Sequence, residues 1–176
     1  MNQEHLDLCN LTPSCSIEAF DCAEDDLNEF LKEESNDYQD ELLAKTYLLM
    51  NAENGDVVAY YSLLNDVIRL ENTEKSIRNR INRKIPFNKQ RNHYPAVKVG
   101  RLAVDKSYAH QGIGRLILDS VKYVFTHGNR TGCRFLTVDA LADATGFYER
   151  NGFRFFTQQD ENHDTRLMYF DLKDFL

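Results

Sequence analysis

The sequence predicts one mixed α/β layered domain over residues 1–176. Short apolar runs of strand length alternate with stretches whose apolar residues recur at three- and four-residue spacing, as in amphipathic helices. A hydrophobic content of 42% in 176 residues is enough to form one buried core. The predicted order is strand, helices, three strands, helix, strand, helix and two strands, which is typical of helices layered on a mixed sheet.

Two helices are predicted near the N-terminus. The first covers Phe20–Leu31, because Leu27 and Phe30 fall on one helical face, and Asp21 is its candidate N-cap. The second is predicted over Ser35–Leu43.

A β-hairpin is predicted next. Lys45–Ala52 and Val57–Leu64 have the composition of strands, and Asn54-Gly55-Asp56 between them is a strong turn signal. The polar segment Glu71–His93 follows and is interpreted as a short helix and a loop inserted between strands.

The central part predicts a strand followed by an amphipathic helix. Ala96–Val104 is a mostly apolar run, and Gly100 within it suggests a bulge or a close backbone approach. A helix is predicted to begin at about Gly112. The apolar residues that recur at helical spacing after it are Ile113, Leu116, Ile117, Val121, Val124 and Phe125.

The C-terminal part predicts a strand, a helix and a hairpin. Cys133–Val138 is a buried strand, and Asp143–Asn151 is a short helix that ends at Gly152. Phe153–Thr157 and Arg166–Leu172 are expected to form the closing hairpin.

Composition limits the class of protein. No apolar run approaches the roughly 20 residues of a membrane span, and the N-terminus lacks the layout of a signal peptide, so we expect a soluble, cytoplasmic protein without a membrane partner. The cysteines include no CxxC pair and no Cys/His run has zinc spacing, so free buried thiols and no metal site are expected; these residues are Cys9, Cys15, Cys22 and Cys133. No histidine lies near a Ser or Cys in a nucleophile motif.

Charge is unevenly distributed, although the net charge is −7. Residues 1–45 contain thirteen acidic residues and two lysines, whereas Lys75–His93 contains seven Lys and Arg residues and no acid. Such a basic stretch is typical either of a surface for an anionic partner or of a solvated helix face.

Gly112 and Gly114 suggest a site for a diphosphate. They fall between a strand that ends near Val104 and a helix whose first turn exposes unpaired N–H groups and the positive end of the helix dipole. A dinucleotide motif would require a third glycine where the chain has Ile117, and no Gly-Lys-Ser/Thr follows for a Walker motif. NAD and ATP are therefore disfavoured.

Two motifs resemble those of the Gcn5-related N-acetyltransferases (GNAT). "LAVDKSYAHQGIGRLIL" is similar to the family's acetyl-CoA motif R/Q-x-x-G-x-G/A, and "GFYERNGF", from Gly146 to Phe153, is similar to its later F-Y-x-x-x-G-F signature. The resemblance implies a mostly antiparallel twisted sheet flanked by helices and an acetyl-CoA-dependent N-acetyltransferase. The segments "FDCAEDDLNEFL", "GRLAVDKSY" and "VDALADATGFYERNGF" also resemble GNAT toxins of toxin–antitoxin modules, which acetylate the amino acid on charged tRNA.

The chain departs from the family pattern at two positions. Ala109 stands where the first motif has Arg or Gln, and Leu141 stands where many members have an asparagine. Because main-chain amides bind much of the diphosphate, we expect weakened local contacts rather than loss of the cofactor.

The resemblance assigns roles to the candidate site residues. Tyr148 is expected to donate a proton to the departing thiolate, because a phenol with a pKa of about 10 is protonated at neutral pH; its alternative is a packing tyrosine beside Phe147. Main-chain groups of Leu102, Ala103 and Val104 are expected to pair with the pantetheine and stabilise the oxyanion. The expected diphosphate cradle is Gln111, Gly112, Ile113, Gly114 and Arg115, with Phe147 against the pantetheine or in the core.

The sequence is compatible with several acceptors of the acetyl group. The first hypothesis is an aminoacyl-tRNA guided by Lys75–Arg91, with Phe87 and Tyr94 for stacking. The alternatives are a small amine or a protein amino group, or a catalytically silent acyl-CoA-binding module. No general base is assigned, because Asp139 and Glu149 are weak bases unless buried. An antitoxin partner and a homodimer are further hypotheses.

Overall fold

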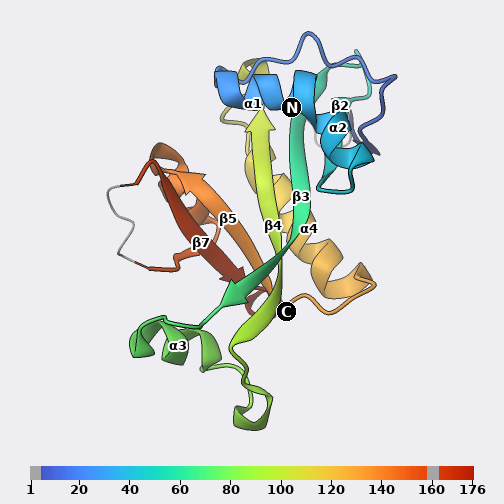
Figure 1. Ribbon diagram of the computed structural model, residues 1–176. Helices are drawn as coiled ribbons and strands as arrows, with labels where there is room; N and C mark the ends of the chain where they lie inside the picture. The colour runs from blue at the N-terminus through green and yellow to red at the C-terminus, as the bar shows by residue number, and fades with distance from the viewer. Residues whose placement is uncertain (1–4, 158–162) are drawn as a thin grey trace. The chain divides into compact units, whose positions relative to one another are not determined.

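The computed structural model describes residues 5–157 and 163–176 (Figure 1). The hydrogen-bonded strand order is β1-β2-β3-β4-β5-β7-β6 in a seven-stranded sheet. The strands are β1 (Leu6–Asn10), β2 (Lys45–Asn51), β3 (Val57–Arg69), β4 (His93–Val104), β5 (Phe135–Leu141), β6 (Arg154–Phe155) and β7 (Thr165–Asp171). The α-helices are α1 (Asp25–Glu29), α2 (Ser35–Asp40), α3 (Lys75–Asn82), α4 (Ile113–Tyr123) and α5 (Thr145–Arg150).

Neighbouring strands are mostly antiparallel, as predicted for this mixed α/β fold. β1 pairs with β2, β2 with β3, and β7 with both β5 and β6 in antiparallel register, whereas β4 and β5 pair in parallel over Ala96–Lys98. The chain forms two compact units, each made of two separate stretches. One comprises Met1–Leu64 and Val99–Val121, and the other comprises Asn65–Lys98 and Lys122–Leu176.

The predicted hairpin in the first unit is confirmed. β2 and β3 pair antiparallel with Leu49 opposite Ala59, and Gly55 has a φ of +76° in the turn that joins them. A positive φ strains residues with a Cβ, which explains the glycine at this position. β3 continues to Arg69, beyond the predicted end at Leu64.

The helices of the first unit differ from their predicted boundaries. α1 begins at Asp25 and continues into a π-helical turn, and Glu24 rather than Asp21 occupies its N-cap position. Asp21 was wrongly assigned: it lies four residues before the start of α1, and its carboxylate binds Lys106, the Ala23 amide and the Asn28 side chain. α2 ends at Asp40 instead of Leu43, since Leu42 has a left-handed φ of +58°.

The core of the first unit forms beneath these helices. Phe30, which lies in the π-helical turn, and Tyr60 of β3 are buried, and their rings stack with centroids 6.3 Å apart. The Tyr60 hydroxyl donates a 2.6 Å hydrogen bond to the Leu27 carbonyl, so the polar end of this buried ring is satisfied. Burial of Leu31 and Leu48 completes the contact between helix and sheet.

Gly100 in β4 marks a close approach, but the neighbouring group is a side chain. A Cβ at Gly100 would lie 2.7 Å from Cδ2 of Leu64, whereas the nearest backbone atom, the Ser62 carbonyl oxygen, would be 3.8 Å away. The sequence analysis predicted a bulge or a close backbone approach at Gly100, and the neighbour that comes close is the Leu64 side chain instead.

In the second unit, β5 and β7 lie side by side (Figure 1). β6 pairs with β7, which confirms the predicted closing hairpin, while β5 begins at Phe135 and extends to Leu141 instead of covering Cys133–Val138. The predicted short helix of Glu71–His93 is α3. Its buried residues Ile77 and Ile81 pack in the same cluster as Phe135.

The two helices that carry the predicted site have the expected order. α4 starts at Ile113, and its Ile117, Leu118 and Val121 are buried. A π-helical turn follows from Val124 to Gly128 and leaves Val124 52% exposed, because its wider hydrogen-bonding pattern rotates the predicted apolar face. α5 ends as predicted before Gly152, whose φ is +85°.

Candidate functional site

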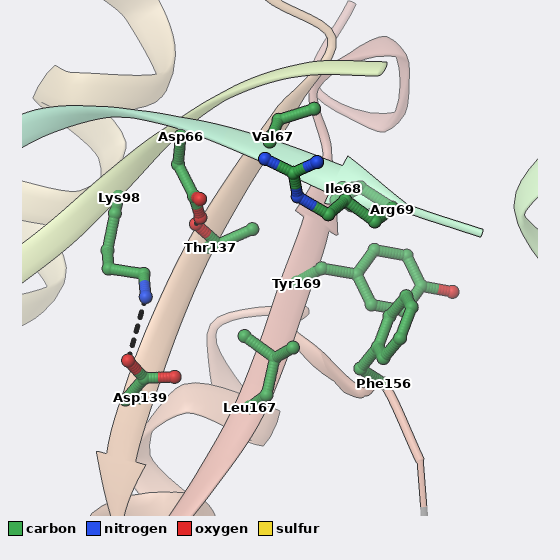
Figure 2. Close-up of a pocket in the computed structure, with 10 residues that line it drawn as sticks. All are labelled: Asp66, Val67, Ile68, Arg69, Lys98, Thr137, Asp139, Phe156, Leu167 and Tyr169. Carbon is green, nitrogen blue, oxygen red and sulfur yellow. Dashed lines mark hydrogen bonds and ion pairs between the residues drawn. The ribbon is translucent and has the colours of Figure 1, made fainter. Parts of the chain in front are cut away.

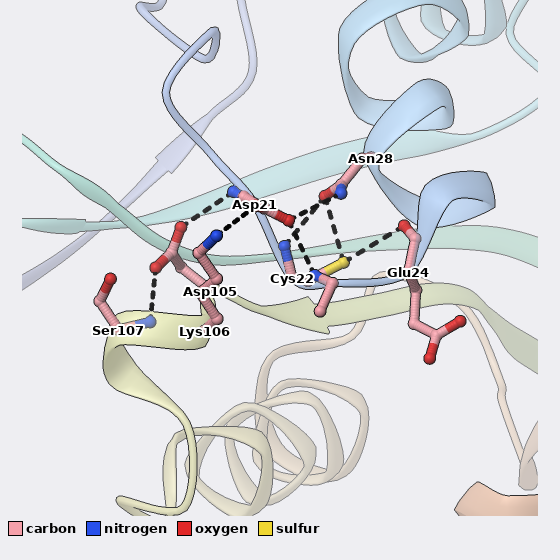
Figure 3. Close-up of polar contacts among 8 residues, drawn as sticks. Asp21, Cys22, Glu24, Asn28, Asp105, Lys106 and Ser107 are labelled. Atoms are coloured by element: carbon pink, nitrogen blue, oxygen red, sulfur yellow. Dashed lines mark hydrogen bonds and ion pairs between the residues drawn. The ribbon is translucent and has the colours of Figure 1, made fainter.

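Asp105 directly follows β4 and organises the start of the loop that leads to α4 (Figure 3). Its carboxylate accepts hydrogen bonds from the backbone amides of Asp21, at 2.9 Å, and Ser107, at 2.8 Å. Its own amide donates to the Val58 carbonyl at 2.9 Å. Asp105 is 8% exposed, and these bonds provide the partners that a buried carboxylate needs.

Asp21 extends this network to the N-terminal segment (Figure 3). Its carboxylate accepts hydrogen bonds from Lys106 Nζ at 2.6 Å, the Ala23 amide at 2.9 Å and Asn28 Nδ2 at 3.0 Å. These bonds, with Lys106 contributing most, hold the pKa of the Asp21 carboxyl well below its usual value. The loop after β4 is thereby fixed to the segment before α1.

The predicted glycine turn lies at the end of this loop. His110 and Gly112 have left-handed φ values of +61° and +81°, and the Gly112 carbonyl accepts from Leu116 N at 3.0 Å. Gly112 therefore precedes the first residue of α4, and the first-turn amides of Ile113, Gly114 and Arg115 have no intrahelical acceptor. Apart from its chain neighbours, no heavy atom of residues 5–157 and 163–176 lies within 4 Å of the position that a Cβ would take at Gly112, so the turn has room for an anion.

Gln111 and Arg115 flank the turn at the surface. The Gln111 amide group donates to the Ser107 carbonyl at 3.5 Å, a long hydrogen bond. Arg115, with a side chain 77% exposed, lies 3.5 Å from Asp119 in an i,i+4 ion pair. Because exposed pairs of this kind contribute little, Arg115 can turn toward a phosphate at small cost.

Leu102, Ala103 and Val104 form the last residues of β4. The parallel register of β4 with β5 covers Ala96–Lys98, and Leu102–Val104 lie beyond it. These residues and Gln111–Arg115 belong to the first unit. Phe147 and Tyr148 belong to the second unit.

Tyr148 lies in α5 and is 6% exposed. Its ring makes edge-to-face contacts with Phe147, at 5.0 Å between centroids, and with Phe153, at 5.4 Å. Burial raises the pKa of Tyr148 to about 12, so its hydroxyl is protonated at neutral pH. Within residues 5–157 and 163–176 the hydroxyl has no hydrogen-bond partner, so this packed tyrosine retains a donor for a ligand.

A buried lysine beside α5 was missed from the sequence. Lys122 is 4% exposed, and its Nζ donates to the Asn151 carbonyl at 2.9 Å, just after the end of α5. The ammonium also lies 4.4 Å from the centre of the Phe170 ring. Its position four residues after the buried Leu118 is a signal for burial, which the charge of the side chain obscured.

A cavity of about 220 Å³ lies in the second unit (Figure 2). Asp66 and Lys98 line it, and neither was singled out from the sequence. A charged residue within a strand could have indicated a functional or paired position, because such residues are seldom buried without a partner. Lys98 Nζ lies 2.7 Å from Asp139 Oδ2, so the candidate base Asp139 is engaged in an ion pair. Glu149, the other candidate, is exposed.

The basic segment Lys75–Arg91 is partly occupied by structural contacts. Arg80 donates to the carbonyls of Phe155, at 2.8 Å, and Phe156, at 2.7 Å, while Lys84 pairs with Asp174. Arg80 and Lys84 of this segment are therefore engaged within the fold, whereas Arg83 is exposed.

The two aromatic residues proposed for stacking have different positions. Tyr94 is 6% exposed, and its hydroxyl donates to Asn82 Oδ1 at 2.6 Å, so its proposed stacking role is unsupported. Phe87 is 89% exposed, at the start of a 3-10 turn that also contains Lys89. Phe87 is therefore the accessible ring of this segment.

Ala109 ends the 3-10 turn before the glycines, and Leu141, at the end of β5, is 42% exposed. The four cysteines are free thiols, as predicted, but each is half-buried rather than buried. Among residues 5–157 and 163–176, no helix is long and apolar enough to cross a membrane.

Comparisons with known proteins agree with this architecture. The chain is similar to a tyrosine-to-phenylalanine mutant of KacT in a crystal structure: the two sequences are 28% identical, the TM-score is 0.76, and the match covers 97% of both chains. AtaT complexed with acetyl-methionyl-tRNAfMet is 26% identical, with a TM-score of 0.76 and 96% coverage of both chains. An AtaT mutant toxin bound to the C-terminus of the antitoxin AtaR and acetyl-CoA shares the fold at 23% identity, with a TM-score of 0.73 and coverage of 97% of this chain and 96% of that one.

The family match includes both predicted motifs. The family described as "Acetyltransferase (GNAT) domain" matches residues 53–155, a range that contains the glycine turn and Tyr148. The chain therefore belongs to the GNAT acetyltransferase family.

Proposed function

We propose that residues 1–176 act as one N-acetyltransferase domain that transfers the acetyl group of acetyl-CoA to the amino group of an aminoacyl-tRNA. The observation that carries the choice of acceptor is the similarity over 96% of both chains to AtaT complexed with acetyl-methionyl-tRNAfMet. The single-domain proposal is supported by the family match, which draws on residues of both compact units.

The glycine turn is proposed to bind the diphosphate of acetyl-CoA. Its fit is supported by the left-handed Gly112, the open space around it, and the first-turn amides that lack intrahelical acceptors. Gln111 and Arg115 border this cradle. Main-chain groups of Leu102–Val104 are proposed to pair with the pantetheine and to stabilise the oxyanion, with Phe147 against the pantetheine.

Tyr148 is proposed to protonate the sulfur that leaves. A free thiol has a pKa of about 8.5, so a phenol with a pKa of about 12 is a weak acid toward a thiolate in water. Burial that raises the pKa of the phenol also raises that of a neighbouring thiol, which brings the two pKa values closer. The hydroxyl can therefore donate a hydrogen bond to the developing thiolate and then its proton.

The acceptor amine needs no dedicated base in this proposal. The amine of an aminoacyl ester is less basic than that of a lysine side chain, so a larger fraction is neutral at pH 7. A mechanism without a dedicated base is consistent with the ion pair between Asp139, the candidate base, and Lys98.

The charged tRNA is proposed to contact the exposed part of the basic segment. Lys75, Arg83 and Lys89 are exposed and can approach phosphates, while Phe87 offers a ring for an unpaired base. An antitoxin is proposed as a protein partner, because the AtaT mutant toxin of similar fold is bound to the C-terminus of AtaR.

Acetyl transfer to a panel of acceptors tests the proposal. Purified protein and labelled acetyl-CoA are incubated with charged tRNAs, the same tRNAs uncharged, a polyamine and a lysine peptide. We expect label on charged tRNA alone, released with the amino acid on mild alkaline hydrolysis. Label on the polyamine or the peptide at an equal rate would contradict the proposed acceptor.

A further inference from the structure

The cavity of about 220 Å³ occupies one face of the β5–β7 pair (Figure 2). Directly opposed residues of an antiparallel pair point to the same face, and Thr137 opposes Tyr169 while Asp139 opposes Leu167. All four line the cavity. The cavity is therefore built on regular strands, which hold its side chains in fixed positions.

One wall of the cavity is apolar. Ile68 of β3, Leu167 and Tyr169 of β7, and Phe156 after β6 contribute to it. The rings of Phe156 and Tyr169 meet edge to face with centroids 6.3 Å apart, and Tyr169 is 3% exposed. For comparison, an engineered apolar cavity of about 150 Å³ binds benzene, so this volume is sufficient for a large amino-acid side chain.

The polar part of the cavity contains two carboxylates that have different partners. Asp139 is neutralised by Lys98 at 2.7 Å (Figure 2). Asp66 is half-buried and accepts a hydrogen bond from the buried Thr137 hydroxyl. Among the described residues no cation lies within 4.0 Å of the Asp66 carboxylate. Because a carboxylate can accept several hydrogen bonds, Asp66 has capacity for an amino group.

Tyr148 is connected to the same strand pair through aromatic rings. Phe170 opposes Leu136, so these two point away from the cavity side of β5 and β7. Phe170 contacts Phe153 at 5.7 Å, and Phe153 contacts Tyr148 at 5.4 Å. Phe153 and Phe170 thus connect Tyr148 to the strand pair that carries the cavity.

From this geometry we propose that the cavity binds the aminoacyl group of the acceptor. The wall of Ile68, Phe156 and Leu167 takes the side chain, and the Asp66 carboxylate accepts a hydrogen bond from the amino group. The site selects amino acids with a large apolar side chain, such as methionine, leucine or phenylalanine, over glycine and acidic residues. This inference rests on the proposed function and narrows its substrate class.

Binding of amino-acid amides tests the cavity without tRNA or turnover. The probes are leucinamide, methioninamide, glycinamide and aspartamide (aspartic acid α-amide), titrated into the whole protein while methyl and amide NMR signals are followed. We expect saturable shifts at Ile68 and Leu167 with the first two probes, and binding at least about tenfold weaker for the last two. Equal affinities, or shifts that avoid these residues, would overturn the proposal.

Two variants probe the two halves of the site. Leu167→Phe reduces the volume, with Leu167→Trp as the stronger form, and is expected to weaken methioninamide binding more than glycinamide binding. Asp66→Asn retains an acceptor for Thr137 but removes the charge, and is expected to weaken all amides about equally. Asp143→Asn, at an exposed aspartate, is the matched control and should leave every affinity unchanged.

Acetylation of one tRNA charged with different amino acids separates this inference from the proposed function. Methionyl and leucyl forms are expected to react at least about tenfold faster than the glycyl form. If all forms react equally and no amide binds, the cavity proposal fails and the proposed function stands. If amides bind at the cavity but no charged tRNA reacts, the tRNA acceptor fails and the amine site stands.

Discussion

Lys122 places its ammonium 4.4 Å from the centre of the Phe170 ring and donates a hydrogen bond to the Asn151 carbonyl at 2.9 Å. A cation on an aromatic face and at a helix C-terminus is stabilised by both neighbours. The same Phe170 contacts Phe153, which contacts Tyr148. The buried lysine thus supports the helix that carries the proposed proton donor.

We expect Lys122→Met to lower the free energy of unfolding by about 1–3 kcal/mol, because it leaves the Asn151 carbonyl without this donor. Urea denaturation measures the change, and Lys173→Met, at an exposed lysine, is the control. An unchanged midpoint would mean that the apolar replacement compensates fully for the lost contacts.

Tyr148→Phe is expected to lower kcat by about 10²–10⁴-fold while the affinity for acetyl-CoA stays unchanged, because the ring packing is retained and the proton is lost. Since burial raises the pKa of Tyr148 to about 12, its ionisation should not reduce wild-type activity between pH 6 and 9. Steady-state kinetics and calorimetry measure the two quantities. Normal turnover of the variant would remove Tyr148 from the mechanism.

Gly112→Ala is expected to weaken acetyl-CoA binding and to destabilise the turn, because φ is +81° there and a Cβ makes that conformation costly by about 1 kcal/mol or more. Gly128→Ala is the matched control, since it too has open space around the added methyl group but its φ is not positive. Calorimetric titration with acetyl-CoA compares them. Equal affinities for both variants would argue against a role for the turn.

Asp21→Asn is expected to destabilise the protein at neutral pH, because it removes the charged partner of Lys106. The folded-state pKa of Asp21 is depressed, so its stabilisation is present above its unfolded-state pKa of about 4 and is lost as pH falls further. The difference in unfolding free energy between wild type and variant should therefore shrink below about pH 4. Glu18→Gln, at an exposed glutamate, controls for net charge. A constant difference across this range would contradict the assignment.

Reversal of the exposed charges Lys75, Arg83 and Lys89 to glutamate is expected to reduce acetylation of charged tRNA and to weaken its salt dependence, while acetyl-CoA binding stays intact. Phe87→Ala should add to this loss if its ring stacks on a base. By contrast, Arg80→Glu should lower stability, since Arg80 binds two carbonyls after and within β6. Filter binding at several salt concentrations, with thermal unfolding as the control, distinguishes the two effects.

The sequence was sufficient to predict turns and helix boundaries that depend only on the conformation of neighbouring residues. The Gly55 hairpin, the start of α4 after Gly112 and the end of α5 before Gly152 all depend on backbone conformations that glycine favours. The family motifs then indicated the fold and the family, which the comparisons confirm.

Pairings between distant residues could not be predicted in this way. Asp21 resembles a helix cap, but the partner that lowers the pKa of its carboxyl most is Lys106, far along the chain. Similarly, Arg80 is an exposed cation by its pattern, yet it binds carbonyls more than seventy residues away. Asp66 and Lys98 line one cavity only because β3, β4 and β5 bring them together.

The division of each compact unit between two separate stretches of chain affects how such an enzyme can diversify. No contiguous gene fragment encodes either unit, so recombination cannot exchange one of them as a block. Asp66 and Leu167 belong to one unit and the glycine turn to the other, and substitutions without shared partners generally have additive effects. With the cavity proposed for the acceptor and the glycine turn proposed for the thioester donor, we expect point substitutions in the cavity to change the acceptor while the donor stays the same.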